Sequence, residues 1–496
     1  MKRFFLLTAL SALSCAAIDF DTVFGDHMVL QQGREITLHG TAGKGGNVTL
    51  SFGEHKVPAT VKGKTWYATL PAMPADAEGK DITVTQGKES ATLSDVVVGE
   101  VWVASGQSNM LFRMNQTDTG KTAIAESANG NLRFYHSEPQ VHTNNAVYGE
   151  KELNTLKEEK MYQGQWAVSA PETTPRMSAV GYYFGKELQQ QLGVPVGIIH
   201  ASLGGSEMMA WFPEKLLKKK YPECTTAKWL DSGYISEWVR GRASKNMGAD
   251  KSAHHPYQPG FLFRTGIQPW VNFPVAGVIW YQGESDAEYQ DMKQNSKLLH
   301  DLITSWRHEF KNDKLPFVQV QLPRINDKTP LRAYWPEFRL VQADAAQKMD
   351  GVECVTTIDL GSKNSDVHPN RKVEVGQRLA LTAAAKVYGK DVAYTGPVIT
   401  AVKPQGGSIA VSFDHAEGLK TTDGNAPVGF EVAGGNGKFS PATAEIKGNE
   451  VVLSSPEVKK PVSVRYGWAT YMEPNLVNEA NLPTVPYPMS MGGQKH

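Results

Sequence analysis

Four short polar segments of the chain carry side chains suited to acyl transfer, and each of them follows an apolar run. They are GQSNM at residues 106–110, SLGGS at 202–206, WYQGESD at 280–286 and SDVHP at 365–369. Together they supply a serine, a pair of glycines, an amide side chain and an Asp-x-His pair. A serine nucleophile needs a general base, usually histidine, and hydrogen-bond donors for the developing oxyanion. The four segments therefore predict a serine hydrolase.

Ser108 is the predicted nucleophile because it stands on the turn that leaves a buried strand. At the start of the following helix, backbone N–H groups and the positive end of the helix dipole would stabilise an oxyanion. The G-x-S-x-G elbow of α/β-hydrolases needs a glycine at position 110, where Met110 stands, and this disfavours that fold. The other interpretation of Ser108 is a helix N-cap, a position that serine prefers.

His368 is the predicted general base, and Asp366 lies two residues before it. A carboxylate at that spacing can orient the imidazole and stabilise its cation. In the second segment, Gly204 and Gly205 allow the backbone to approach a substrate closely and to direct an N–H group inward. Each segment alone also fits an ordinary turn or a helix cap. Their occurrence after the strands of one predicted sheet favours the catalytic interpretation.

The elements that position these segments are buried strands alternating with amphipathic helices. Apolar runs without alternation occur at 96–105, 196–201, 275–281, 317–322 and 352–358, as expected for strands buried on both faces of a parallel sheet. Apolar residues recur four apart in 180–192 and 375–387, which predicts helices. This alternation is typical of an α/β domain with a mostly parallel sheet, in which ligands bind beyond the carboxyl ends of the strands.

The regions on either side of this domain have a different pattern. Residues 18–95 and 396–496 contain short β-branched and aromatic runs separated by close turns, which predicts an N-terminal and a C-terminal β-domain. The catalytic domain is therefore expected at 96–395. Residues 214–260 have no clear period and are expected to form an insertion beside the site.

The composition limits the partners and the location of the protein. The 496 residues include 51 basic and 51 acidic ones, and a net charge of zero gives no reason to expect nucleic acid as a partner. Residues 1–17 have two cations, an apolar run and small residues, which predicts a signal peptide, export to the periplasm or outside the cell, and a mature chain from about Ile18. Lipidation of Cys15 is the alternative. No later apolar run is long enough for a membrane span, and no metal-ligand spacing occurs.

The blocks GEVWVASGQSNM, SLGGS, VIWYQGESDA and DVHPN resemble those of the SGNH-hydrolase superfamily, and more narrowly those of the sialate O-acetylesterase family. The opening FGDHMVLQQ and the closing VRYGWATYMEPNLVNEANLP extend the resemblance over nearly the whole mature chain. The resemblance implies an SGNH-hydrolase-like three-layer α/β domain with flanking β-domains. It implies an esterase that removes O-acetyl groups from sugars and needs no cofactor or metal.

By this resemblance, Ser108 is the nucleophile, His368 the base and Asp366 the acid. The backbone N–H groups of Ser108 and Gly205 (or Gly204 in its place) and the side chain of Gln282 would form the oxyanion hole.

Two positions depart from the superfamily pattern. The superfamily places its acid three residues before the histidine, where this chain has Ser365, and the third block usually carries an asparagine, near which this chain has Ser285. These departures leave open whether Asp366 is the acid. Gln282 is preferred to Ser285 as the oxyanion donor because it retains an amide.

Four residues that follow strand ends are expected to bind the sugar: Arg113, Glu207, Trp211 and Glu284. A guanidinium can pair bidentately with a carboxylate such as that of sialic acid, so Arg113 is the candidate for that contact. The expected substrate is O-acetylated sialic acid, with acetylated xylan as the second choice. The alternatives are a catalytically silent glycan-binding protein and an esterase for lipid esters.

Overall fold

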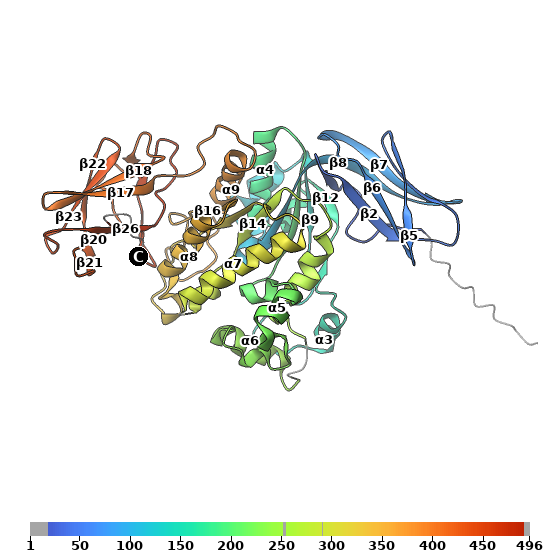
Figure 1. Cartoon of the computed structure of the whole chain (residues 1–496), viewed down its shortest axis with the longest axis horizontal. Coiled ribbons are helices and arrows are strands. Elements are labelled where there is room, and N and C mark those ends of the chain that lie inside the picture. Colours follow the sequence, from blue (N-terminus) through green and yellow to red (C-terminus); the bar gives the residue numbers. More distant parts are fainter. Residues whose placement is uncertain (1–17, 251–253, 290, 491–496) are drawn as a thin grey trace, which may run out of the picture.

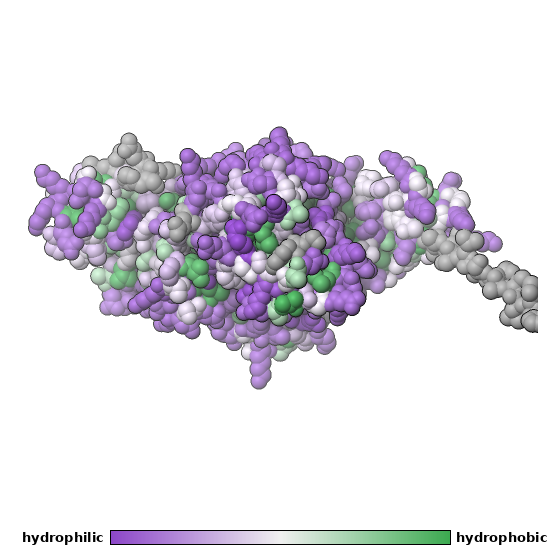
Figure 2. Space-filling model, turned by 90° about the horizontal axis from the view of Figure 1, so that it is seen from below, coloured by the Kyte–Doolittle hydropathy of each residue, from purple (hydrophilic) through white to green (hydrophobic). Residues whose placement is uncertain are grey.

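The computed structural model describes residues 18–250, 254–289 and 291–490. The predicted signal segment, 1–17, lies outside the described residues. A central α/β region lies between two smaller regions of β-structure, one built from each end of the described chain (Figure 1). None of the helices in the described ranges is long and apolar enough to cross a bilayer. Figure 2 shows one face of the molecule, which is mainly hydrophilic with apolar groups in small, separate patches.

The central sheet has the strand order β12-β9-β13-β8-β14-β15-β16. All neighbouring pairs are parallel except β12 with β9 at one edge. The strands are β8 (Glu89–Gly106), β9 (Asn129–His136), β12 (Trp166–Ser169), β13 (Val196–Ser202), β14 (Gly277–Tyr281), β15 (Phe317–Val320) and β16 (Val352–Val355). The mostly parallel α/β sheet predicted from the five apolar runs is therefore confirmed. Strand β9 was not predicted, because its sequence NGNLRFYH mixes polar and apolar residues.

Both faces of this sheet are buried, which explains why its strands do not alternate in polarity. On one face, Trp102 of β8 and Ile279 of β14 pack in a cluster with residues of helices α4 (Ala179–Leu192) and α9 (Val373–Lys386). On the other face, Val103 and Trp280 of the same strands pack in a cluster with residues of α7 (Met292–Glu309) and α8 (Trp335–Lys348). Figure 1 shows these helices over the sheet.

The helix predicted at 180–192 has a capping residue at each of its ends. The Ser178 side chain accepts a hydrogen bond from the N–H of Gly181, and Gly193 ends the helix in a left-handed conformation. The α-helices are α1 (Ser108–Leu111), α2 (Gly120–Ala125), α3 (Glu150–Lys157), α4 (Ala179–Leu192), α5 (Glu214–Lys220), α6 (Glu237–Met247), α7 (Met292–Glu309), α8 (Trp335–Lys348) and α9 (Val373–Lys386). Short 3₁₀ turns are Met114–Gln116, Thr174–Arg176, Met208–Trp211, Pro222–Thr225, Trp229–Asp231, Gln268–Trp270, Asp286–Glu288 and Pro330–Arg332, and Phe263–Ile267 is a π-turn.

Strand β8 joins the N-terminal β-region to the central sheet. Its first half pairs antiparallel with β7, and from Glu100 onward it pairs in parallel with β13. The predicted boundary at residue 95 thus falls inside one continuous strand. The remaining strands of this region are β1 (Val29–Gln31), β2 (Ile36–Thr41), β3 (Val48–Phe52), β4 (His55–Pro58), β5 (Thr60–Lys62), β6 (Thr65–Leu70) and β7 (Asp76–Gln86).

The C-terminal β-region has an apolar cluster of its own, which includes Val411, Val432 and Val464. It contacts the central region through the buried Arg339 of α8, whose guanidinium donates to the carbonyl oxygens of Gly467 and Ala469. Its strands are β17 (Val398–Gln405), β18 (Ser408–Asp414), β19 (Lys420–Thr421), β20 (Phe430–Ala433), β21 (Phe439–Pro441), β22 (Thr443–Lys447), β23 (Glu450–Ser454), β24 (Ser463–Tyr466), β25 (Leu476–Val477) and β26 (Pro488–Ser490). A separate short pair is β10 (Glu138–Pro139) with β11 (Tyr162–Gln163).

Candidate active site

A cavity of about 400 Å³ lies beyond the carboxyl ends of β8, β13 and β14. Ser108 and His368 both line it, although 260 positions separate them in the sequence, and they come from the loops after β8 and β16. The structure therefore brings together the predicted nucleophile and base. Other predicted site residues that line the cavity are Gly204, Gly205 and Glu284.

Two glycines shape the backbone near the cavity, Gly106 before Ser108 and Gly205 in the cavity lining. Gly106 ends β8 at a φ of 140°, and a Cβ there would lie 2.0 Å from the carbonyl oxygen of Tyr281. Gly205 has a φ of 71°, and a Cβ there would lie 2.4 Å from the Tyr257 hydroxyl. Only glycine combines these conformations with such close packing. The turn after β8 can therefore place Ser108 at the first position of α1.

His368 has the surroundings of a base that stays neutral. Its Nδ1 lies 3.5 Å from Oδ1 of Asp366, and the same carboxylate oxygen accepts from the backbone N–H of His368 at 2.9 Å. Burial lowers the pKa of His368, and the Asp366 carboxylate acts against this by raising it. The Phe112 ring stacks beside the imidazole, with the ring centres 6.4 Å apart. Within the described ranges, Ser108 and His368 share no direct hydrogen bond, and such contacts often tighten only when substrate binds.

Gln282 does not occupy the position predicted for an oxyanion donor. Its side chain is 2% exposed and lies outside the cavity lining. Its amide nitrogen donates to the Asp286 carboxylate and, at 3.2 Å, to the carbonyl of Ser206. The prediction for Gln282 is therefore wrong, because the residue order after a strand does not tell which side chain turns toward the core.

Gln107 is the amide side chain that does line the cavity, directly before the nucleophile. Its Oε1 accepts from the backbone N–H groups of Gly283 and Ser285 at 3.2 and 3.3 Å. With the oxygen held in this way, the NH₂ end is the part of the side chain that can donate to an oxyanion. Gln107 stands in the GQSNM segment but was not predicted as a site residue. The feature that could have identified it is an amide side chain directly before the nucleophile.

Glu207 and Trp211 belong to the core rather than to the rim of the cavity. Trp211 is fully buried, and its indole N–H donates to the Ser206 hydroxyl at 3.0 Å. Glu207 accepts from the backbone N–H of Ser236 at 3.0 Å, and burial raises its pKa to about 8. Neither residue lines the cavity, so the predicted role in sugar binding is wrong for both.

Arg113 is also outside the cavity, and its charge is already neutralised. Its guanidinium pairs with Glu138, which also contacts Arg176 at 3.1 Å and His136 at 2.8 Å. The hydrogen bond from His136 and the two guanidinium groups outweigh partial burial and lower the pKa of Glu138 to about 2. In this geometry Arg113 is paired with Glu138 and is not brought to the cavity, so its pairing with a substrate carboxylate stays a prediction.

Glu284, by contrast, lies at the cavity as predicted, and it belongs to a buried polar network. Asn109 donates from Nδ2 to Glu284 Oε1 at 2.5 Å and to the carbonyl of Val367 at 2.9 Å. Asn109 Oδ1 accepts from Nζ of the fully buried Lys372 at 2.5 Å. Burial lowers the pKa of Lys372 to about 7 and raises that of Glu284. Asn109 thus links the nucleophile turn to the residue before His368.

The region 214–260 supplies the remaining wall of the cavity, with Trp238 and Arg242 of α6 and with Tyr257. The Arg242 guanidinium lies 5.0 Å from the centre of the Trp238 ring and donates to the carbonyl of Thr143. Sequence reasoning placed this region beside the site but did not identify these residues, because it has no periodic pattern from which to assign an inward face.

A serine on a strand-to-helix turn and a histidine from a distant loop, meeting at the carboxyl edge of a mostly parallel sheet, are the features of an ester hydrolase. The family model described as "Carbohydrate esterase, sialic acid-specific acetylesterase" matches residues 234–385. The chain is an esterase, as predicted, and residues 234–385 are similar to this carbohydrate esterase family.

The relatives and a solved structure agree with this assignment over most of the chain. A sialate O-acetylesterase from Mus musculus is 26% identical over 91% of this chain and 90% of its own length. The sialate O-acetylesterase from Homo sapiens is 28% identical over 76% of this chain and 73% of its own length. A crystal structure of a carbohydrate acetylesterase from Xanthomonas citri is 29% identical and superposes with a TM-score of 0.77, covering 95% of this chain and 99% of that one.

Proposed function

We propose that this esterase removes O-acetyl groups from sugars through an acetyl-enzyme formed on Ser108. His368 takes the proton of the Ser108 hydroxyl as Oγ attacks the acetyl carbonyl carbon. The backbone N–H groups of Ser108 and Gly205 and the amide of Gln107 donate to the oxyanion. When the tetrahedral intermediate collapses, the sugar oxygen leaves with the proton from His368. Water, activated by the same imidazole, then hydrolyses the acetyl-enzyme and releases acetate.

The observation that carries this proposal is the single cavity that Ser108 and His368 share at the carboxyl edge of the sheet. Asp366 is the proposed orienting acid, because its carboxylate is the one beside Nδ1. Its side chain is 60% exposed, so water weakens its interaction with the imidazole. We therefore propose that Ser108 and His368 contribute more to the rate than Asp366 does.

The proposed substrate is an acetylated sialic acid, whose carboxylate would bind Arg242. Two guanidinium groups line the cavity, those of Arg242 and Arg332. Arg332 pairs with Glu288 at 2.7 Å, whereas Arg242 has no carboxylate partner among the described residues and bonds only to a backbone carbonyl. An anion at Arg242 would also lie beside the Trp238 ring, whose face can pack against the sugar.

Replacing Arg242 with glutamine should raise KM for O-acetylated sialic acid about tenfold or more, the scale of a lost hydrogen bond to a charged group. The change should leave kcat/KM for acetylated xylo-oligosaccharides within about twofold, because those substrates carry no carboxylate. The measurement is acetate release from both substrates. Arg176→Gln, at an arginine outside the cavity, is the control. A clear preference of the wild type for the xylo-oligosaccharide, unaffected by Arg242→Gln, would favour acetylated plant polysaccharide as the substrate.

The pH dependence of the reaction should follow His368, whose neutral form is the base. Because burial lowers its pKa below the usual value, kcat/KM for 4-nitrophenyl acetate should stay level through mildly acidic pH and fall only at lower pH. The Asp366 carboxylate raises this pKa, so Asp366→Asn should move the acid limb to still lower pH. The exposed Asp391 provides the control variant Asp391→Asn. An acid limb that Asp366→Asn leaves in place would remove Asp366 from the proposed site.

The remaining proposals concern the architecture and the location of the protein. The central region is proposed to be an SGNH-type three-layer domain at 96–395, with β-domains at 18–95 and 396–496 on either side. Burial of the central sheet under α4 and α9 on one face and α7 and α8 on the other supports the three-layer arrangement. Export follows from the predicted signal peptide and suits an enzyme that acts on glycans outside the cytoplasm.

A further inference from the structure

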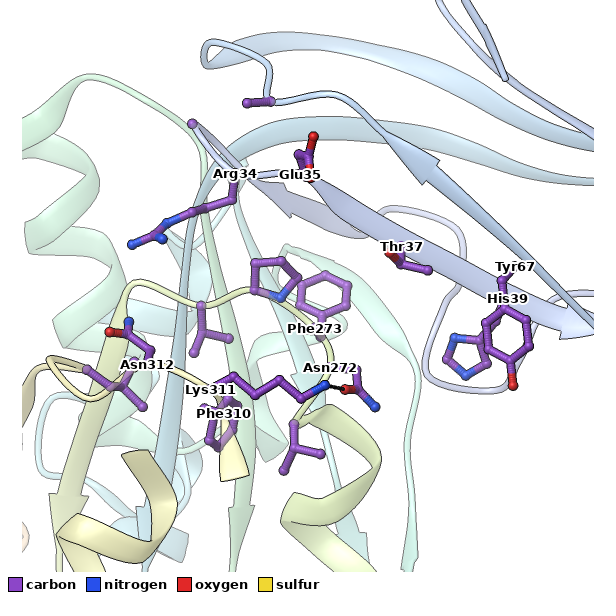
Figure 3. A pocket seen from close by; sticks show the side chains of 16 residues that line it. Arg34, Glu35, Thr37, His39, Tyr67, Asn272, Phe273, Phe310, Lys311 and Asn312 are labelled. Atoms are coloured by element: carbon purple, nitrogen blue, oxygen red, sulfur yellow. Dashed lines mark hydrogen bonds between the residues drawn. The ribbon is translucent and has the colours of Figure 1, made fainter. Parts of the chain in front are cut away.

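We infer that the protein has a second carbohydrate-binding site, a cavity of about 790 Å³ at the junction of the N-terminal β-region and the central sheet. Figure 3 shows this junction cavity, with Arg34 and Asn312 toward one end and the rings of Tyr67 and His39 at the other. Cavities of this size at the contact of two structural units are common places for ligands.

The junction cavity is separate from the cavity that holds Ser108. It is lined by residues 271–275, which precede β14, whereas Glu284, which follows β14, lines the catalytic cavity. The two sites therefore lie at opposite ends of the same strand, which for five residues means roughly 17 Å of intervening sheet. A single sugar unit cannot occupy both.

An aromatic surface forms one wall of the junction cavity. Tyr67 of β6 stands opposite His39 of β2 in the strand register, and the two rings stack with their centres 5.8 Å apart. The Tyr67 side chain is 39% exposed, one of the few large apolar groups left exposed in the described chain. A broad, rigid ring with a polar tip is suited to pack against the C–H face of a sugar while its hydroxyl bonds to the sugar's edge.

The polar groups of the cavity offer both donors and acceptors, as the hydroxyl groups of a sugar require. Arg34 and Lys311 supply donors, and Glu35 supplies a carboxylate. Within the described ranges, neither Arg34 nor Glu35 has an ion pair or a side-chain hydrogen bond, while Lys311 donates to the Asn272 side chain at 2.9 Å. Charges of both signs argue against a polyanion, and the polar side chains of the lining argue against an apolar ligand. An oligosaccharide satisfies both conditions.

The test uses the full-length chain and two deacetylated probes, xylohexaose and 3′-sialyllactose. Calorimetry measures all binding of each probe, and inhibition of 4-nitrophenyl acetate hydrolysis measures binding at the catalytic cavity alone. We expect at least one probe to show a binding event that inhibition does not account for. Tyr67→Ala should weaken this event about tenfold, on the scale of a lost aromatic contact, and should leave kcat/KM for 4-nitrophenyl acetate unchanged.

Val61→Ala is the matched control, because Val61 is exposed on the same small sheet but outside the cavity. Arg34→Ala should weaken the extra event as well, through loss of the donor at the other end of the cavity. The inference is overturned if inhibition accounts for all binding of both probes, or if Tyr67→Ala binds as Val61→Ala does. Failure of the proposed catalytic mechanism would be visible separately, as loss of hydrolysis or of inhibition.

Discussion

Replacing Ser108 with alanine should lower kcat/KM for 4-nitrophenyl acetate by about 10³-fold or more, the scale of the loss when a catalytic serine is deleted. The physical reason is that no other hydroxyl is proposed to form the acetyl-enzyme. Ser108 is partly exposed at the cavity, so the change removes no buried contact and the fold should remain intact. Circular dichroism and the unfolding midpoint check the fold, and a burst-phase assay checks for the acetyl-enzyme.

Ser105→Ala is the matched control for this experiment. Ser105 lies three residues earlier on β8, is fully buried, and its hydroxyl has no hydrogen-bond partner among the described residues. Removing such a hydroxyl costs little stability and does not touch the site. Activity near that of the wild type in well-folded Ser108→Ala protein would show that a different residue is the nucleophile.

Replacing Asn109 with alanine should have the second large effect. It removes the amide that joins the nucleophile turn to the carbonyl of Val367, and it leaves Lys372 and Glu284 buried without their common partner. We expect kcat to fall about 10²-fold, as for a misplacement of roughly 1 Å between reacting groups. The free energy of unfolding should fall by about 3 kcal/mol, because a buried charge loses its hydrogen bond.

The control for Asn109→Ala is Asn478→Ala in the C-terminal β-region. Asn478 is likewise buried, and its amide donates to the carbonyls of Thr395 and His415. Both variants should lose stability, but only Asn109→Ala should lose kcat when the two are compared at a temperature where both are folded. Equal kcat in the two variants would mean that Asn109 supports the fold without positioning the catalytic groups.

The central sheet could be predicted from the sequence because its physical signal is strong. Strands such as β14, with the sequence GVIWY, are apolar at every position because both faces of the sheet are covered, and a short apolar run rich in β-branched and aromatic residues is typical of a buried strand. Strand β9 lies toward the edge and carries Arg133 and His136 among its apolar residues, so its pattern is ambiguous. A strand of this kind is recognised only from its neighbours.

The site was partly predictable for a related reason. The order of strands and loops places Ser108 and His368 at one edge of the sheet, and that much follows from the topology of a parallel sheet. Which side chains of a loop turn inward depends on packing that the sequence does not reveal. Trp211 and Gln282 follow strands as Glu284 does, yet the first two are held in the core by hydrogen bonds to Ser206.

Because β8 is one continuous strand, the N-terminal β-region cannot be separated from the central region at residue 95. The strand that ends at the nucleophile turn begins as one half of a hairpin with β7, and β1 pairs with it at Val97–Gly99. Cutting the gene at codon 95 would leave the catalytic half with an exposed strand edge and no partner to satisfy its backbone groups. The N-terminal region therefore cannot be exchanged as an independent domain. Fusions and domain swaps should instead join near residues 387–397, between α9 and β17, where no strand is interrupted.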